Sequence, residues 1–158
     1  MHGLLPTVQI RKGENKYIEF KETFSRNIKS GQKQKDKEIE KASLKTIVGF
    51  LNADGGTLLI GVSDKGEVKG VDNDFFDSSD KYKLNFKNAI QSKIGKEFYS
   101  LIDYDLFNIA GCHILKVDCK KSSKPCYYEE DDFFVRTNPA TDLLKGRERD
   151  EYIKMRFK

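Results

Sequence analysis

The chain contains no tryptophan, only two methionines and two histidines, and three cysteines. No apolar run approaches the roughly 18 residues that a membrane-spanning helix needs, so we expect no membrane partner. The first residues lack the basic region and long apolar stretch of a signal peptide, which predicts a cytoplasmic protein. Cys112, Cys119 and Cys126 form no Cys-x-x-Cys pair, and neither histidine joins them in a ligand pattern, so we expect no zinc.

The chain is long enough to bury a core of its own, and its charge is unevenly distributed. It has 158 residues, of which 37% are hydrophobic and 34% charged, with a net charge of +4. Lysines cluster in 29–45, 81–96, 116–124 and 145–158, and carboxylates in 72–80 and 129–132. Such clusters favour a nucleic-acid partner, although solvated helix faces explain them equally well. The candidate nucleic-acid contacts in the first cluster are Lys33, Lys35, Lys37, Lys41 and Lys45.

Hydrophobic periodicity predicts a single α+β domain, in which helices flank a mixed β-sheet. The domain spans 1–158, with a core of about 14–152. Helical spacing marks 36–51, 79–94 and 142–156. Alternating or β-rich runs mark strands at 17–22, 57–62, 101–107, 112–118, 126–128 and 133–136. A strand or extended arm is predicted at 8–11, and 67–71 is predicted to pair with 57–62 as a hairpin.

Carboxylates and a lysine gather at the ends of two predicted strands. Glu19 and Lys21 stand two apart, so their side chains leave the same face of a strand. Glu14 precedes this strand, and Asp64 follows the 57–62 strand at an exposed end. If these strands are neighbours, the carboxylates meet and can bind Mg²⁺ or Mn²⁺, while the lysine faces a phosphate. The simpler interpretation is an exposed Glu19–Lys21 ion pair and a turn aspartate.

Two further features are compatible with a phosphate ligand. Gly55, Gly56 and Gly61 predict a helix cap and a close backbone approach, but the Gly-Lys-[Ser/Thr] element of a phosphate loop is missing. Arg136 ends a predicted strand before a polar turn, where it either contacts phosphate or is simply an exposed residue of an edge strand.

The run from 14 to about 152 resembles the Schlafen AlbA-like domain, on four motifs that occur in the family's order. They are Glu14 with Glu19-Phe20-Lys21; Phe50-Leu51-Asn52 with Gly55-Gly56; Leu59-Ile60-Gly61-Val62 with Asp64, Gly66, Val68 and Gly70; and Phe134-Val135-Arg136.

The resemblance implies a function. In animal Schlafen proteins the domain cuts structured RNA such as transfer RNA, using two glutamates and an aspartate with a divalent cation, and these roles fall on Glu14, Glu19 and Asp64. RNA is therefore implied ahead of DNA. Two such units are fused in the animal proteins, so a single copy would have to form a homodimer to build a comparable groove. Many bacterial members look like DNA-binding modules of regulators, and an ATP-binding domain is a weaker alternative.

Overall fold

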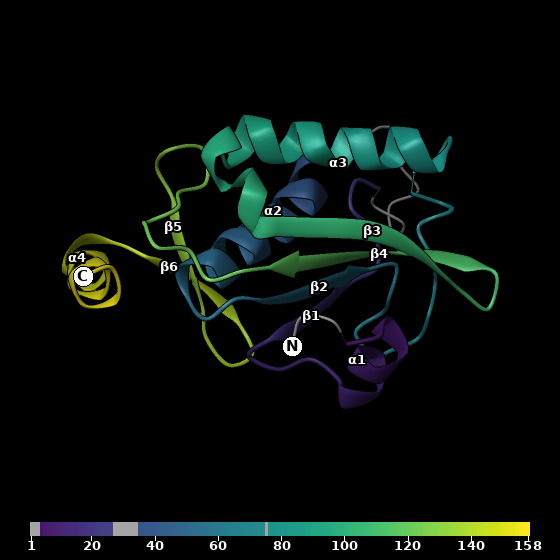
Figure 1. Ribbon diagram of the computed structural model, residues 1–158, viewed down its shortest axis with the longest axis horizontal. Helices are drawn as coiled ribbons and strands as arrows, with labels where there is room; N and C mark the ends of the chain where they lie inside the picture. The colour runs from purple at the N-terminus through teal and green to yellow at the C-terminus, as the bar shows by residue number, and fades with distance from the viewer. Residues whose placement is uncertain (1–3, 27–34, 75) are drawn as a thin grey trace.

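A computed structural model describes residues 4–26, 35–74 and 76–158 and confirms the α+β fold with a mixed sheet (Figure 1). The sheet has four strands in the order β1-β2-β4-β3. β1 and β2 are parallel, and the other two pairs are antiparallel. The strands are β1 (Ile18–Lys21), β2 (Gly56–Ile60), β3 (Ile102–Ile109) and β4 (Cys112–Cys119).

Helices cover both faces of this sheet, and a small second sheet packs beside it (Figure 1). No helix in the described part of the chain is long and apolar enough to cross a lipid bilayer. The remaining elements are α1 (Pro6–Lys12), α2 (Lys37–Asn52), α3 (Ser79–Lys93), the 3₁₀ helix η1 (Lys96–Leu101), the hairpin of β5 (Phe133–Arg136) with β6 (Thr141–Leu144), and α4 (Gly146–Arg156).

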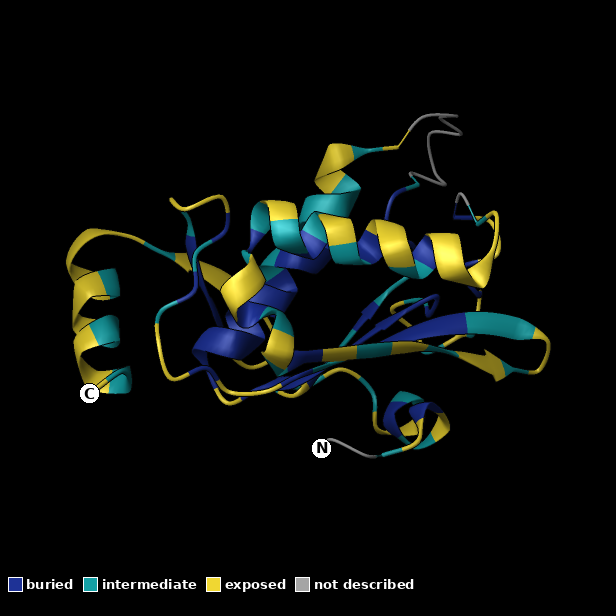
Figure 2. Ribbon diagram, turned by 45° about the horizontal axis from the view of Figure 1, so that its top comes forward, coloured by how far each residue is buried: buried dark blue, intermediate teal, exposed yellow. Residues whose placement is uncertain are grey.

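Helix α2 connects the two parallel strands and lies at the centre of the molecule. Asp36 caps its N-terminus, because one carboxylate oxygen accepts from the backbone N–H groups of Glu38 (2.9 Å) and Ile39 (3.4 Å). From Ser43 onward most of its residues are buried, as the dark ribbon in Figure 2 shows. The helix therefore packs on the sheet along one side and on the β5–β6 hairpin along another.

Apolar side chains fill both sides of the sheet. The larger cluster lies between the sheet, α2 and α3 and includes Leu58, Ile60 and Phe86. The smaller cluster, on the opposite face, includes Ile18 and Phe20. Alternate residues of β1 thus point into the smaller cluster, which leaves Glu19 and Lys21 on the other face.

The turn between α2 and β2 needs its two glycines for different reasons. Gly55 has a φ of 81°, and its N–H donates to the Phe50 carbonyl at 2.9 Å, which closes the last turn of the helix. A Cβ on Gly56 would collide with the ring of Phe50. The chain can therefore reverse tightly and enter β2 directly beside β1.

Several predicted elements were wrong in detail. The 8–11 segment is helical, because Pro6 occupies the first turn and Gln9 is buried against the sheet. Segment 67–71 makes only an isolated bridge, between Val62 and Val68, because β4 takes the free edge of β2. Segment 126–128 likewise contributes a single bridge. The start of the predicted 142–156 helix is β6, and α4 begins only at Gly146.

Candidate functional site

The predicted strand neighbours are indeed adjacent, which brings three of the candidate residues to one end of β1. The Nζ atom of Lys21 lies 3.7 Å from Oε2 of Glu19, so the two side chains share a face as expected. Beyond β2, the backbone N–H groups of Gly61 and Val62 both donate to the Lys21 carbonyl, at 2.7 and 3.2 Å. This bends the chain around the end of β1 and carries Asp64 to the same edge, where its side chain is exposed.

Glu14 turns its carboxyl group inward onto β1, although the residue as a whole is exposed. Its Oε1 accepts from the Phe20 N–H at 2.9 Å. Burial of the carboxyl group raises the pKa of Glu14 to about 7, and a hydrogen bond with Glu19 and the charges of Glu19 and Asp64 act in the same direction. The three carboxyl groups are thus close enough to influence one another electrostatically.

The raised pKa of Glu14 predicts a pH-dependent stability. Between its ordinary pKa of 4.5 and about 7, the folded protein keeps a proton that the unfolded chain loses, so stability falls as pH rises through this interval. Glu14→Gln retains a neutral side chain and should escape the fall. In thermal melts with chelator present, its Tm relative to wild type should increase from about pH 5 to about pH 8. Glu148→Gln, on the exposed face of α4, is the control; a constant difference for Glu14→Gln would contradict the prediction.

Arg136 is buried, contrary to the surface position that both interpretations of its sequence context required. Its side chain is 1% exposed, and Nη1 lies 2.5 Å from Oε1 of Glu19. Its guanidinium also donates to the backbone carbonyls of Asn15 (2.7 Å), Lys16 (3.3 Å) and Ile18 (3.2 Å). Arg136 therefore holds the edge of β1 and one oxygen of Glu19, and in this arrangement its donors face the interior rather than a bound phosphate.

Two residues of α2 that sequence reasoning overlooked allow Arg136 to reach this position. A Cβ on Gly49 would lie 2.9 Å from the Thr141 methyl group and 3.1 Å from the Arg136 nitrogen, so only glycine lets the hairpin approach the helix this closely. The ring of Phe50 lies 5.1 Å from the Arg136 guanidinium carbon, in a cation–π contact. The one available signal was the place of Phe50 in the Phe-x-Asn motif.

Asn52 was also overlooked as a site-building residue. Its side-chain amide donates to the carbonyls of Cys126 and Phe134, both at 2.8 Å, and its oxygen accepts from the Cys126 N–H at 2.9 Å. The backbone carbonyl of Asn52 accepts from the Tyr152 hydroxyl at 2.6 Å. These bonds fix β5 against the end of α2 and so support the position of Arg136.

The carboxylates suit a hard divalent cation by chemistry, since Glu14, Glu19 and Asp64 offer only oxygen ligands. As the side chains lie, however, no three His, Cys, Asp or Glu residues in the described part of the chain form a group that could hold a metal ion. Glu14 shares a hydrogen bond with Glu19, and both oxygens of Glu19 have cationic neighbours. A cation would have to replace these contacts.

The predicted nucleic-acid lysines are dispersed. Lys33 lies outside the described residues, and Lys35 and Lys37 are exposed at the start of α2. Lys41 lies 3.9 Å from the Asp132 carboxylate and 5.4 Å from the centre of the Tyr128 ring. Lys41 and Lys45 line a shallow hollow together with carboxylates, so the positive charge of this helix face is partly compensated.

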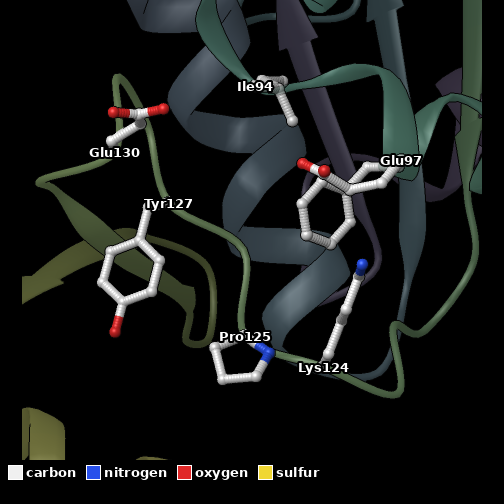
Figure 3. Close-up of a pocket in the computed structure, with 7 residues that line it drawn as sticks. Ile94, Glu97, Lys124, Pro125, Tyr127 and Glu130 are labelled. Atoms are coloured by element: carbon white, nitrogen blue, oxygen red, sulfur yellow. The ribbon is translucent and has the colours of Figure 1, made fainter.

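A separate hollow of about 240 Å³ lies away from the candidate carboxylates (Figure 3). Figure 3 shows Glu97 and Lys124 on one side of it, with Tyr127 and Glu130 across from them. The Lys124 ammonium stands 5.2 Å from the centre of the Phe98 ring. Because two carboxylates line this hollow, it does not favour a polyanionic ligand.

The folded arrangement and the site agree with a family assignment. The model of the family Schlafen, AlbA_2 matches residues 14–145, and the chain belongs to this family. Membership associates the chain with a nucleic-acid-related function. A search of the curated proteins found no significant match.

Solved structures share the fold at low sequence identity. The DIP2311 protein from Corynebacterium diphtheriae superposes with a TM-score of 0.64 at 17% identity, over 87% of this chain. This chain spans only 26% of that protein. The N-terminal domain of an ATP-dependent DNA helicase RecG-related protein from Nitrosomonas europaea gives a TM-score of 0.56 at 18% identity, over 92% of this chain and 93% of that domain. At these identities the likeness shows the fold alone.

Proposed function

We propose that the chain is a divalent-metal-dependent endoribonuclease that acts on structured RNA such as transfer RNA. The observation that supports this most is the meeting of Glu14, Glu19 and the Asp64 turn at one end of β1, beside Lys21. The site lies on an exposed sheet edge, which suits a polymer better than an enclosed small molecule. Family membership supports a nucleic acid as the polymer.

Each residue has a distinct role in this proposal. Glu14, Glu19 and Asp64 would hold Mg²⁺ or Mn²⁺, and such a cation, when bound, polarises a phosphoryl oxygen and lowers the pKa of a bound water. Lys21, whose side chain is 28% exposed, is placed to stabilise negative charge on the phosphate. Arg136 keeps Glu19 oriented from inside the protein.

A non-catalytic DNA-binding module is the second candidate, and one observation favours it. Glu19 is engaged by Arg136 at 2.5 Å and by Lys21 at 3.7 Å, so its carboxylate already has a structural role that needs no metal. ATP binding has less support, because the chain lacks a phosphate loop and carboxylates line the hollow of Figure 3.

Incubation of the protein with transfer RNA, single-stranded DNA and double-stranded DNA separates these functions. With Mn²⁺ we expect RNA fragments, and with excess chelator we expect intact RNA. The same samples should show salt-sensitive binding in chelator, because phosphate contacts release counterions. Intact RNA under all conditions, together with retained salt-sensitive binding to DNA, would instead support the DNA-binding module. Light scattering on the same preparation tests the predicted homodimer.

A further inference from the structure

Three basic residues border the candidate carboxylates from two separate segments. Arg11 and Lys12 form the last turn of α1, and only Gly13 separates Lys12 from Glu14. Lys65 directly follows Asp64. All three residues are exposed. We call Arg11, Lys12 and Lys65 the basic rim.

The two segments of the basic rim touch each other, so the three charges belong to one surface. A Cβ on Gly66 would lie 3.6 Å from the Ile10 side chain and 3.7 Å from the Ile10 carbonyl. Ile10 and Val68 also pack against the same apolar cluster beneath β1 and β2. The end of α1 and the turn after β2 are therefore side by side, with Glu14 and Asp64 beside them.

Buried polar contacts fix α1 in place and so hold the basic rim. Nε2 of Gln9, a fully buried residue, donates to the Thr57 hydroxyl at 2.9 Å, and that hydroxyl donates to Asp118 at 2.6 Å. Lys116 donates to the backbone carbonyl of Leu4, immediately before the helix. A helix of seven residues is unstable alone, and these contacts supply its tertiary support. The rim is thereby preorganised relative to the sheet that carries Glu19.

The charges of the basic rim differ from those of other surface lysines in their pairing. In the described residues, neither Arg11, Lys12 nor Lys65 makes an ion pair, and each lacks an intramolecular carboxylate that would compete with phosphate. By contrast, other lysines are paired: Lys16 with Asp54 at 2.6 Å, Lys41 with Asp132 at 3.9 Å, Lys83 with Asp105 at 3.3 Å, and Lys93 with Glu129 at 3.1 Å.

We propose that the basic rim, rather than the lysines of α2, binds the RNA phosphates that flank the cleaved bond. This inference rests on the proposed function and specifies where its substrate lies. Because the rim offers cationic side chains alone, it recognises the phosphate backbone and not the bases. RNA hairpins of different sequence should therefore bind with similar affinity.

Two triple variants test this placement. The rim variant carries Arg11→Gln, Lys12→Gln and Lys65→Gln, and the α2 variant carries Lys37→Gln, Lys41→Gln and Lys45→Gln. Each triple reduces the net charge from +4 to +1 (4 − 3 = 1), so nonspecific charge effects are matched. Binding of a fluorescein-labelled RNA hairpin is followed by anisotropy in chelator over a series of salt concentrations. Thermal melts verify that each variant is folded.

The rim variant should bind about tenfold or more weakly at about 0.1 M salt, and its slope of log Kd against log salt should decrease by about two. The α2 variant should change the affinity by less than about threefold. An unchanged rim variant, or an α2 variant that loses as much affinity as the rim variant, would overturn the inference while the proposed function stands. A wild-type protein that binds no RNA even at low salt would instead defeat the proposed function itself.

Discussion

Replacing Arg136 with methionine should lower the free energy of unfolding by about 3–5 kcal/mol, the range for removing one partner of a buried ion pair. The substitution leaves Glu19 without its cation at 2.5 Å and three backbone carbonyls of the 15–18 segment without their donor. Arg136→Lys should recover little, because an ammonium group cannot reproduce the planar fork that reaches several acceptors at once.

Urea unfolding of the metal-free protein measures this effect. Arg149→Met is the matched control, since Arg149 pairs only with the exposed Asp150, and surface pairs contribute about 0–1 kcal/mol. A double variant with Glu19→Gln should lose less stability than the sum of the single variants, because the two residues interact directly. A loss below about 1 kcal/mol for Arg136→Met would show that the hairpin holds β1 by other means.

Asp64→Ala should reduce RNA cleavage by at least about a hundredfold while leaving the melting temperature unchanged. Loss of a residue that merely supports a metal ligand typically costs 10–100-fold, so loss of a ligand itself should exceed about that range. Asp64 is exposed and makes no hydrogen bond or ion pair with any residue that the structure describes, so the fold does not depend on it. Asp77→Ala, at another exposed loop aspartate, is the control.

Glu19→Ala should behave differently from Asp64→Ala, although the sequence placed both residues at exposed strand ends. The Glu19 side chain is only 14% exposed and is paired with Arg136. Its removal should therefore lower both cleavage and stability. Equal cleavage by wild type, Asp64→Ala and Glu19→Ala would end the catalytic proposal, and an Asp64→Ala protein that melts early would contradict its independence from the fold.

The sequence predicted the parts of the fold that local patterns determine. The apolar stripe of α2 follows from helical spacing, and the alternation in β1 places Ile18 and Phe20 below the sheet and Glu19 above it. The adjacency of β1 and β2 was a condition rather than a deduction, since a strand–helix–strand pattern allows other strand orders. Family motifs indicated Glu14 and Asp64, whose spacing alone is also that of ordinary turn residues.

Tertiary contacts determine what the sequence did not reveal. Helix α1 contains the β-branched residues Val8 and Ile10, which favour a strand, and it is helical because the sheet binds Gln9 and packs against Ile10. Strand β6 begins Thr141-Asp142, which reads as a helix start, but β5 takes it as a partner. The burial of Arg136 depends on how closely this hairpin approaches Gly49, a distance that no local pattern encodes.

The position of Arg136 also affects how the sequences of relatives should be interpreted. An arginine that fastens a sheet edge is retained by selection for folding, whether or not the protein has a reaction to perform. The same reasoning applies in part to Glu19, because it is the partner of that arginine. Asp64 has no such second duty among the contacts described, so it is free to drift once cleavage is no longer selected. Among proteins of this family, the residue at the position of Asp64 should therefore be the more informative marker of an active or a retired nuclease.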